Sequence, residues 1–221
     1  MKKLLAVLLT LSMLFALAAC GASGPKDTSV PADDQTSSSS APDTTPSDAP
    51  SDEASTEPVK SGAKSLVVYF SWSGHTEKVA KSIQNQTGSD IFEIVPKTPY
   101  STDYNTVVDD AKVEQRNHAR PEIKESIPNI ADYDTVYVGF PNWWGDMPMI
   151  LYTFFDTYDL SGKTVALFCT SGGSGLSNTV NEVKELEPNA VVTKGLHIGS
   201  GASADPDSAV KSWLDEIGMA T

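Results

Sequence analysis

From residue 65 onward, short apolar runs alternate with stretches that have the periodicity of a helix. Several runs are apolar at successive positions, whereas a strand with one solvated face would alternate apolar and polar residues. Strands of this kind are buried on both faces, which is typical of a parallel sheet covered by helices. The alternation therefore predicts an α/β protein with a three-layer, doubly wound, five-stranded parallel sheet. The predicted strands are Leu66–Phe70, Ile91–Val95, Thr135–Phe140 and Val165–Cys169, with a fifth at Ala190–Val192 or in the stretch on to Ile198.

Three of the intervening helices are predicted from apolar residues three and four positions apart. The second should end at Arg120–Pro121, because a proline disfavours helical backbone in the residue before it. The last should have Asp205 as its cap, Pro206 in its first turn and Gly218 beyond its end. The residues expected to face inward are Thr76, Val79, Ala80 and Ile83, then Tyr104, Val107, Val108 and Ala111, and finally Val210, Trp213, Leu214 and Ile217.

The first 20 residues have the order of a secretory signal peptide: Lys2 and Lys3, an apolar stretch over residues 4–17, and small residues before Cys20. The apolar stretch is shorter than the roughly 20 residues that cross a bilayer. The run LAAC resembles the lipobox of bacterial lipoproteins, in which the cysteine carries a diacylglycerol. The resemblance implies a lipoprotein signal peptide over residues 1–20 and lipidation of Cys20. The protein would then be exported and lipid-anchored to the extracytoplasmic face of the bacterial cell membrane. An ordinary signal peptide with an incidental cysteine is the alternative.

Residues 21–62 are rich in Ser, Thr, Pro, Ala and Asp and contain no aromatic residue. Such a tract cannot bury enough apolar surface to offset its ordering entropy, so it is predicted to be a disordered spacer before one folded domain, residues 63–221. The formal net charge is −13, and about −9 remains on residues 63–221 once the signal peptide and the spacer are set aside. Because nucleic-acid binding needs clustered Lys and Arg, we expect no nucleic-acid partner.

Cysteine, histidine and serine patterns exclude several kinds of chemistry. With Cys20 assigned to the anchor, Cys169 has no disulfide partner, and it is expected to be a buried, small apolar residue rather than a redox thiol. The three histidines show no metal-ligand spacing, so no metal site is expected. The nucleophile elbow GxSxG is absent from the serine-rich loops. We therefore assign no catalytic side chain.

In doubly wound sheets, ligands bind beyond the carboxyl ends of the strands, so the loops at those ends carry the candidate site. The loop SWSGHT, residues 71–76, follows the first strand and opens a helix. Its hydroxyls and backbone N–H groups suit the terminal phosphate of a mononucleotide, because the start of a helix attracts anions. A serine-capped strand-to-helix turn is the alternative.

The loop PNWWGDMP, residues 141–148, follows the strand Thr135–Phe140. Adjacent residues at a strand end point to opposite faces, so one of Trp143 and Trp144 is available as an aromatic wall for a flat ligand. Gly145 permits a backbone geometry closed to other residues. The alternative is that Trp144 packs on a helix and Trp143 covers the sheet edge.

The loop TSGGSG, residues 170–175, follows the strand Val165–Cys169. Its three glycines indicate either close approach of the backbone to a ligand or a flexible turn.

Taken together, the three loops resemble those of the flavodoxin superfamily, in the branch that has a Trp-Trp second loop and a TSGGSG third loop. The resemblance extends over almost all of residues 65–218. It implies a flavodoxin-like sheet of order 2-1-3-4-5 and FMN as the cofactor. By resemblance, Ser71, Ser73, Gly74, His75 and Thr76 would hold the phosphate, Pro141, Asn142, Trp143, Trp144 and Gly145 would form the loop whose tryptophans flank the isoalloxazine, and Thr170, Ser171, Gly172, Gly173 and Gly175 would approach the ring edge.

The resemblance also implies redox chemistry, either electron transfer or flavin-dependent reduction, with an unidentified redox partner at the membrane surface. His75 stands where an asparagine is common in the family. Residues 117–121 could form a lid over the ring or a solvated helix end, and their polarity favours the second. A flavodoxin-like fold without flavin, acting as a surface ligand-binding or interaction module, is the alternative function.

Overall fold

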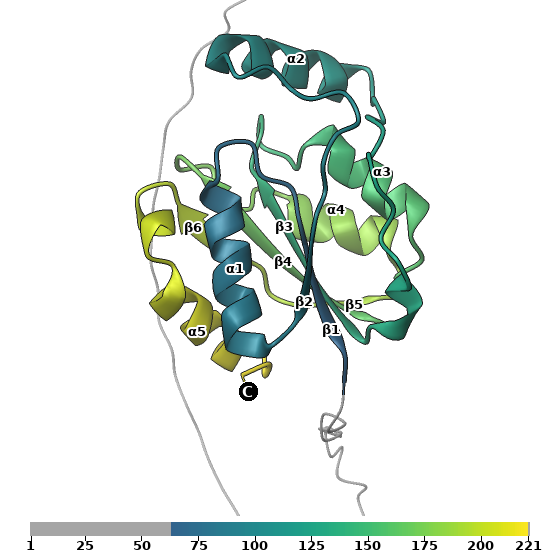
Figure 1. The fold of residues 1–221 in the computed structure, drawn as a ribbon, viewed down its shortest axis with the longest axis vertical. Helices are drawn as coiled ribbons and strands as arrows, with labels where there is room; N and C mark the ends of the chain where they lie inside the picture. Colours follow the sequence, from purple (N-terminus) through teal and green to yellow (C-terminus); the bar gives the residue numbers. More distant parts are fainter. Residues whose placement is uncertain (1–62, 221) are drawn as a thin grey trace, which may run out of the picture. The chain divides into compact units, whose positions relative to one another are not determined.

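The computed structural model describes residues 63–220, shown in colour in Figure 1. The predictions of a signal peptide, of lipidation at Cys20 and of a spacer lie outside the described residues. Among residues 63–220, no helix has both the length and the apolar character needed to cross a membrane.

The strands form one parallel sheet of order β2-β1-β3-β4-β5, with β6 also paired to β4. The predicted α/β class, parallel pairing and strand order are confirmed. The strand β3 is central and pairs with β1 on one side and β4 on the other. The strands are β1 (Ser65–Tyr69), β2 (Asp90–Glu93), β3 (Thr135–Pro141), β4 (Thr164–Ser171), β5 (Val191–Val192) and β6 (Leu196–Gly199).

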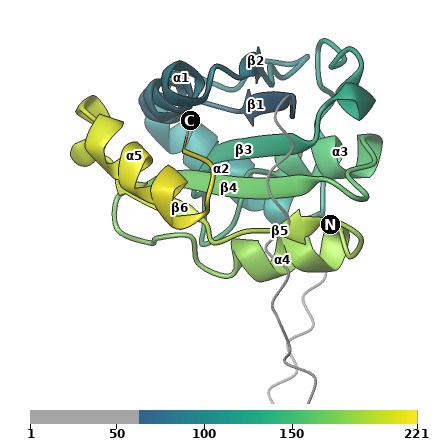
Figure 2. The same cartoon turned by 90° about the horizontal axis from the view of Figure 1, so that it is seen from below.

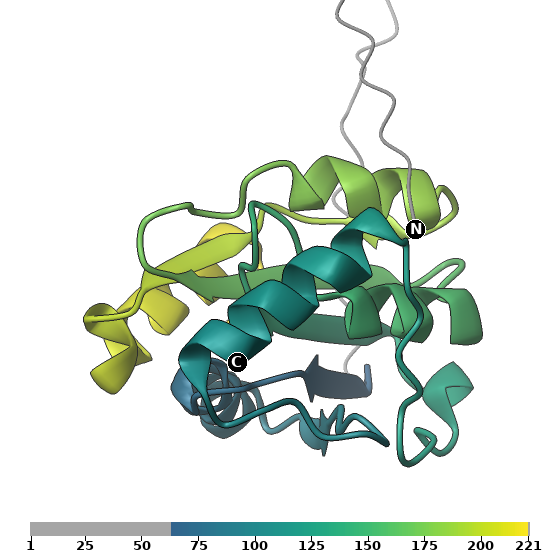
Figure 3. The same cartoon turned by 90° about the horizontal axis from the view of Figure 1, so that it is seen from above.

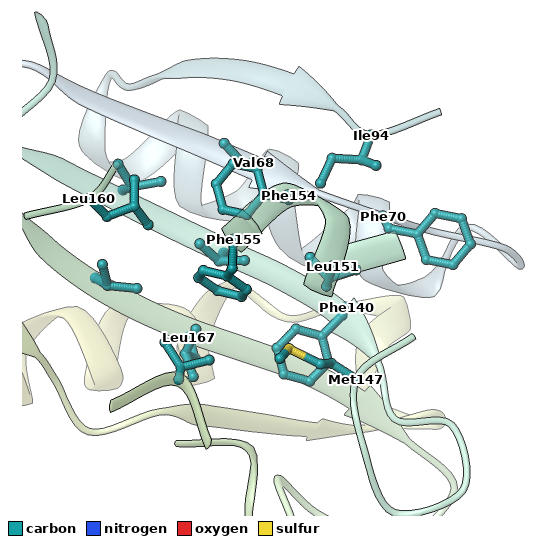
Figure 4. Close-up of a cluster of buried hydrophobic side chains, with 14 of the residues drawn as sticks. Val68, Phe70, Ile94, Phe140, Met147, Leu151, Phe154, Phe155, Leu160 and Leu167 are labelled. Atoms are coloured by element: carbon teal, nitrogen blue, oxygen red, sulfur yellow. The ribbon is translucent and has the colours of Figure 1, made fainter. Parts of the chain in front are cut away.

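Helices cover both faces of the sheet, as the apolar strands require. On one face α1 (His75–Thr87) and α5 (Asp207–Glu216) pack against residues such as Val67 and Tyr69 (Figure 2). On the other face α3 (Met149–Thr157) and α4 (Thr179–Leu186) pack against residues such as Leu66 and Val68. Figure 4 shows this second cluster, with Phe154 of α3 among the strand side chains.

The fifth position of the sheet is divided into two short strands, which combines the two alternatives that the sequence left open. The first, β5, pairs with the beginning of β4, and β6 pairs with its end. Between them lies Gly195, where a Cβ would come within 2.8 Å of the Leu176 side chain. A side chain at position 195 would therefore clash with Leu176.

Helix α2 (Tyr104–Arg116) lies across the carboxyl ends of the strands instead of on a sheet face (Figure 3). Val107 and Ala111 are buried, as the periodicity predicts. Tyr104 is 66% exposed, so its predicted inward orientation is wrong. The periodicity identified a buried stripe but could not identify what that stripe covers, because it depends only on spacing along one helix.

Two predicted helix ends are also wrong. Helix α2 ends at Arg116, before Pro121, because His118 adopts a left-handed conformation (φ 48°). The N–H of Ala119 then donates to the carbonyl of Glu114 and the N–H of His118 to that of Gln115, which is the Schellman arrangement.

Helix α5 begins at Asp207, with Pro206 in the capping position, so Asp205 is not its cap. The carboxylate of Asp207, the first residue of α5, accepts a hydrogen bond from the Ser82 hydroxyl of α1, 2.5 Å away. The expected glycine beyond the end of α5 is confirmed, since Gly218 has φ 72°. Two short 3-10 turns, η1 (Ile130–Asp132) and η2 (Ala202–Ala204), precede β3 and α5.

The close packing of β3 against β4 gives a testable prediction. Gly139 and Phe168 are in register, and a Cβ on Gly139 would lie 2.1 Å from the Phe168 ring. We expect Gly139→Ala to lower the free energy of unfolding by roughly 3 kcal/mol or more, because overpacking a rigid core forces side chains off their rotamers. Urea denaturation of the full chain measures this. Gly199→Ala is the matched strand control, since its Cβ would meet nothing within 4 Å. Equal effects of the two substitutions would contradict the prediction.

Candidate functional site

The first, second and third loops (residues 71–76, 141–148 and 170–175) lie together at the carboxyl ends of β1, β3 and β4, as Figure 1 allows the reader to follow. Two buried hydroxyls join the first region to the third, since Thr76 Oγ1 lies 2.9 Å from Thr170 Oγ1. Asn142 joins the second to the third. Its backbone N–H donates to the carbonyl of Thr170 at 2.8 Å, and its Nδ2 donates to the carbonyl of Gly175 at 3.0 Å. The predicted convergence of the three loops is confirmed.

The first turn of α1 has backbone N–H groups that find no acceptor within the helix. Gly74 occupies the capping position with φ 80°, and no side chain caps the helix. The first helical hydrogen bond runs from Lys78 N–H to the Gly74 carbonyl, so the preceding N–H groups of the first turn have no acceptor within the helix. The Ser71 hydroxyl accepts from Gly74 N–H at 3.1 Å and holds the turn, while Ser73 is exposed. This arrangement is suited to an anion.

The second loop makes a tight reversal. Trp143 and Asp146 form an antiparallel bridge, and both residues between them, Trp144 and Gly145, have positive φ (56° and 82°), as in a type I′ turn. A glycine suits this conformation, whereas a tryptophan in it is strained. Asn142 Oδ1 accepts from Gly145 N–H at 3.0 Å and supports the turn from inside.

The two tryptophans have different surroundings. Trp143 is half-buried, and its ring meets those of Phe70 and Tyr100 edge-on, with centroids 5.5 and 5.2 Å away. Trp144 is 51% exposed and lies against α2: its Nε1 donates to the Val108 carbonyl at 3.0 Å. The alternative in which Trp144 packs on a helix therefore describes part of its environment, yet both tryptophans line the same cavity.

Ser171 holds the third loop together from within. Its hydroxyl accepts from the N–H groups of Gly173 and Gly175, at 3.2 and 3.1 Å, and lies 2.8 Å from His197 Nε2. A Cβ on Gly172, Gly173 or Gly175 would meet nothing within 4 Å, so the space above these glycines is open. The structure thus places the Ser171 side chain inside the loop and leaves the glycine backbone at its surface.

A cavity of about 320 Å³ lies among the loops beneath α2. This volume is within the range of small-molecule sites. None of its lining side chains is charged. The lining residues are Trp72, Tyr104, Val107, Val108, Ala111, Asn142, Trp143, Trp144, Gly145 and Ser174.

Helix α2 forms the roof of this cavity, and two indole N–H groups attach it. Trp72 Nε1 donates to the Ser101 carbonyl just before α2 at 2.8 Å, and Trp144 donates to the carbonyl of Val108 within it. The Lys112 ammonium of α2 lies 4.3 Å from the center of the Trp144 ring, a favourable cation–π contact. Residues 117–121 follow the end of α2 and do not line this cavity, so this segment forms no lid over it, and α2 itself covers the cavity.

Five lining residues were not selected from the sequence: Trp72, Ser174, Val107, Val108 and Ala111. Tyr104, which the periodicity predicts to face inward and which is not a predicted site residue, also lines the cavity. Trp72 and Ser174 belong to loops that the motifs identified, so their position was an available signal. The α2 residues gave no such signal, because the motif positions do not show where that helix lies. Of the predicted site residues, only Asn142, Trp143, Trp144 and Gly145 line the cavity, and the roles assigned to all the predicted site residues stay predictions.

Two expectations about chemistry can be compared with the structure. Cys169 is buried, its Sγ lies 3.2 Å from the Gly175 carbonyl, and burial raises the pKa of its thiol to about 12. This confirms a buried cysteine that is poorly suited to redox chemistry. Within residues 63–220, no group of three or more His, Cys, Asp or Glu side chains is placed to hold a metal ion.

Comparison with known proteins shows several similar proteins. A protein of Bacteroides eggerthii described as a flavoprotein is 35% identical, with a TM-score of 0.64 over 71% of this chain and 98% of that one. A Lactobacillus acidophilus flavoprotein solved in complex with FMN is 28% identical, with a TM-score of 0.55 over 66% of this chain and 99% of that one. A Caulobacter vibrioides protein named NAD(P)H dehydrogenase (quinone) is 28% identical over 168 residues, 70% of this chain and 77% of that protein.

The family described as flavodoxin matches residues 64–217, which include every strand of the sheet and all three loops. The chain therefore belongs to the flavodoxin family.

Proposed function

We propose that this chain binds FMN at the carboxyl ends of β1, β3 and β4 and acts as a redox protein, in electron transfer or flavin-dependent reduction. The observation that carries the proposal is the combination of an uncapped helix start with an uncharged, aromatic-walled cavity at one edge of the sheet. The flavoprotein solved with FMN and the relative named NAD(P)H dehydrogenase (quinone) support it.

The residues at the start of α1 fit a phosphate. The free N–H groups of the first turn and the Ser73 hydroxyl are hydrogen-bond donors, and the helix adds a favourable potential for an anion. Thr76 would contribute its backbone N–H, because its hydroxyl is already bonded to that of Thr170.

The cavity fits a flat aromatic ring. Trp72, Tyr104, Trp143 and Trp144 supply aromatic surface, and the apolar side of α2 covers it. When bound, FMN supplies a ring that accepts and returns electrons. The chain's own residues hold and orient that ring, and the roof formed by Val107, Val108 and Ala111 excludes water from it.

We further propose that the domain is tethered to the outer face of the membrane through a lipid on Cys20. Support comes from the sequence alone: a basic start, an apolar stretch and small residues that end on this cysteine. Two acyl chains suffice for stable anchoring, whereas one is marginal. The redox partner would then act at the membrane surface.

The phosphate cradle predicts discrimination between FMN and riboflavin, which lacks the phosphate. We expect Ser73→Ala to weaken FMN roughly 10- to 100-fold and to leave riboflavin affinity unchanged, because a hydrogen bond to a charged group is worth about 1.5 to 3 kcal/mol. Quenching of flavin fluorescence measures both affinities. Ser126→Ala, another exposed serine, is the control. If wild type binds FMN and riboflavin equally well, the start of α1 is not a phosphate site, and if it binds neither, the flavin-free alternative replaces this proposal.

Replacing Trp143 and replacing Trp144 should have different effects on FMN affinity and on stability. Trp144→Ala should weaken FMN about 2- to 10-fold through loss of an aromatic contact, with little change in stability, since half of Trp144 is already exposed. Trp143→Ala should lower both FMN affinity and the free energy of unfolding, because Trp143 packs on Phe70 and Tyr100. Trp144→Phe separates the loss of the ring from the loss of its hydrogen bond to Val108. Unchanged FMN affinity in Trp144→Ala would remove this side chain from the site.

The proposed lipid anchor predicts that replacing Cys20 changes how the protein divides between the membrane and soluble fractions. Cys20→Ala should be released from the membrane fraction or be sorted differently, because no lipid can be attached. Immunoblotting of membrane and soluble fractions measures this, with Cys169→Ala as the matched cysteine control. Identical fractionation of Cys20→Ala and wild type would show that Cys20 is not the anchor.

A further inference from the structure

His75, the first residue of α1, has one ring nitrogen fixed by a buried serine. Its Nδ1 lies 2.6 Å from the hydroxyl of Ser203 in η2, and Ser203 is fully buried. The same hydroxyl lies 2.7 Å from the carbonyl of Ser200. A carbonyl only accepts, so the single hydroxyl proton of Ser203 is donated to Ser200. Nδ1 of His75 must therefore carry a proton and donate it to Ser203.

The other ring nitrogen then depends on the charge of the ring. Because Nδ1 holds the proton of the neutral imidazole, Nε2 is a bare acceptor in that state, and it becomes a donor only when the ring is positively charged. Nε2 has no hydrogen-bond partner among residues 63–220. A phosphate dianion has only hydrogen-bond acceptors, as does Nε2 of the neutral ring. The two can therefore form a hydrogen bond only if a proton is added between them.

The first loop offers no other cation for a phosphate. Residues 71–76 contain no Lys or Arg, and the donors around the start of α1 are neutral amides and hydroxyls. Glu77, in the first turn, is acidic and pairs with Lys81 at 2.5 Å. A dianion bound here would meet no positively charged side chain of this loop unless His75 becomes charged.

We propose that His75 is the protonated partner of the FMN phosphate, so that binding FMN takes up a proton held between Nε2 and the phosphate. This inference rests on the proposed function, because it requires FMN phosphate at the start of α1. His75 is thereby a specificity-determining residue: it favours ligands that carry a phosphate, and more strongly at lower pH, because the bound state holds an extra proton.

Other ionisable groups lie on the elements packed around α1, which are β1, β2, β3, β4, η2 and α5. Burial raises the pKa of Tyr69 on β1, Tyr137 on β3 and Cys169 on β4 to about 12, so these groups do not titrate between pH 6 and 8.

The remaining groups are exposed or only partly buried. Burial and the neighbouring Glu77 raise the pKa of Glu93 on β2. The other charged groups are Glu77, Lys78 and Lys81 on α1, Asp90 on β2, His197 on β6 beyond β4, Asp205 after η2, and Asp207, Lys211, Asp215 and Glu216 on α5. Their contributions are common to wild type and to a variant at position 75, so the difference between the two isolates His75.

Isothermal titration calorimetry of the full chain with FMN tests the proposal. Titrations at pH 7.5 in buffers of different ionisation enthalpy give the number of protons taken up. Wild type should take up close to one proton, and its FMN affinity should fall roughly tenfold per pH unit above neutrality, as linkage requires when the bound state holds an extra proton. His75→Asn keeps a neutral donor and should take up almost none. Its affinity should vary much less with pH.

Three controls make the result specific. Riboflavin should bind without proton uptake, and His118→Asn, an exposed histidine in a left-handed conformation that asparagine tolerates, should behave as wild type. Ser203→Ala removes the acceptor at Nδ1, which lets a neutral ring carry its proton on Nε2, so proton uptake should fall while FMN still binds. Nitrogen NMR of the apo chain should show the neutral ring of His75 protonated at Nδ1.

The outcomes separate the two hypotheses. FMN binding with equal proton uptake in wild type and His75→Asn, or an apo ring protonated at Nε2, overturns the role of His75 and leaves the FMN site intact. A chain that binds no FMN, or that binds FMN no better than riboflavin, overturns the proposed function and this inference together.

Discussion

The rest of the structure depends on the parallel pairing of β3 with both β1 and β4. Parallel strands in register end at the same edge, so the loops that follow β1, β3 and β4 must emerge side by side. The Phe168 ring of β4 lies over Gly139 of β3, where a Cβ would come within 2.1 Å of it. Residues about 100 positions apart in sequence, such as Thr76 and Thr170, then come within hydrogen-bonding distance.

The loops of the site are held mostly by their own polar groups. Ser71, Asn142 and Ser171 each bond to backbone groups of a loop. These bonds fix the backbone before any ligand arrives, which lowers the ordering cost of binding. They also mean that several hydroxyls of the motifs stabilise the loops, so a serine in one of these motifs need not touch a ligand.

The site is formed by helix α2 as well as by the three loops. Helix α2 closes the cavity with apolar side chains and is attached through the indoles of Trp72 and Trp144. The side chains that line the cavity are uncharged, whereas the start of α1 is rich in donors and has His75 as its first residue. The two halves of the site thus suit the two halves of a flavin mononucleotide, an aromatic ring and a phosphate.

The sequence by itself determined the α/β class, the parallel sheet and the three loops, because apolar runs, glycines and hydroxyls act through local periodicity and short-range geometry. It also determined that Cys169 has no partner within the folded domain. Only the tertiary structure decided where α2 lies, since its apolar stripe could equally cover a sheet face. Tertiary structure likewise decided that Trp143 is packed and Trp144 is exposed, and that His75 Nδ1 lies against the Ser203 hydroxyl, because a contact across 128 residues leaves no trace in local sequence.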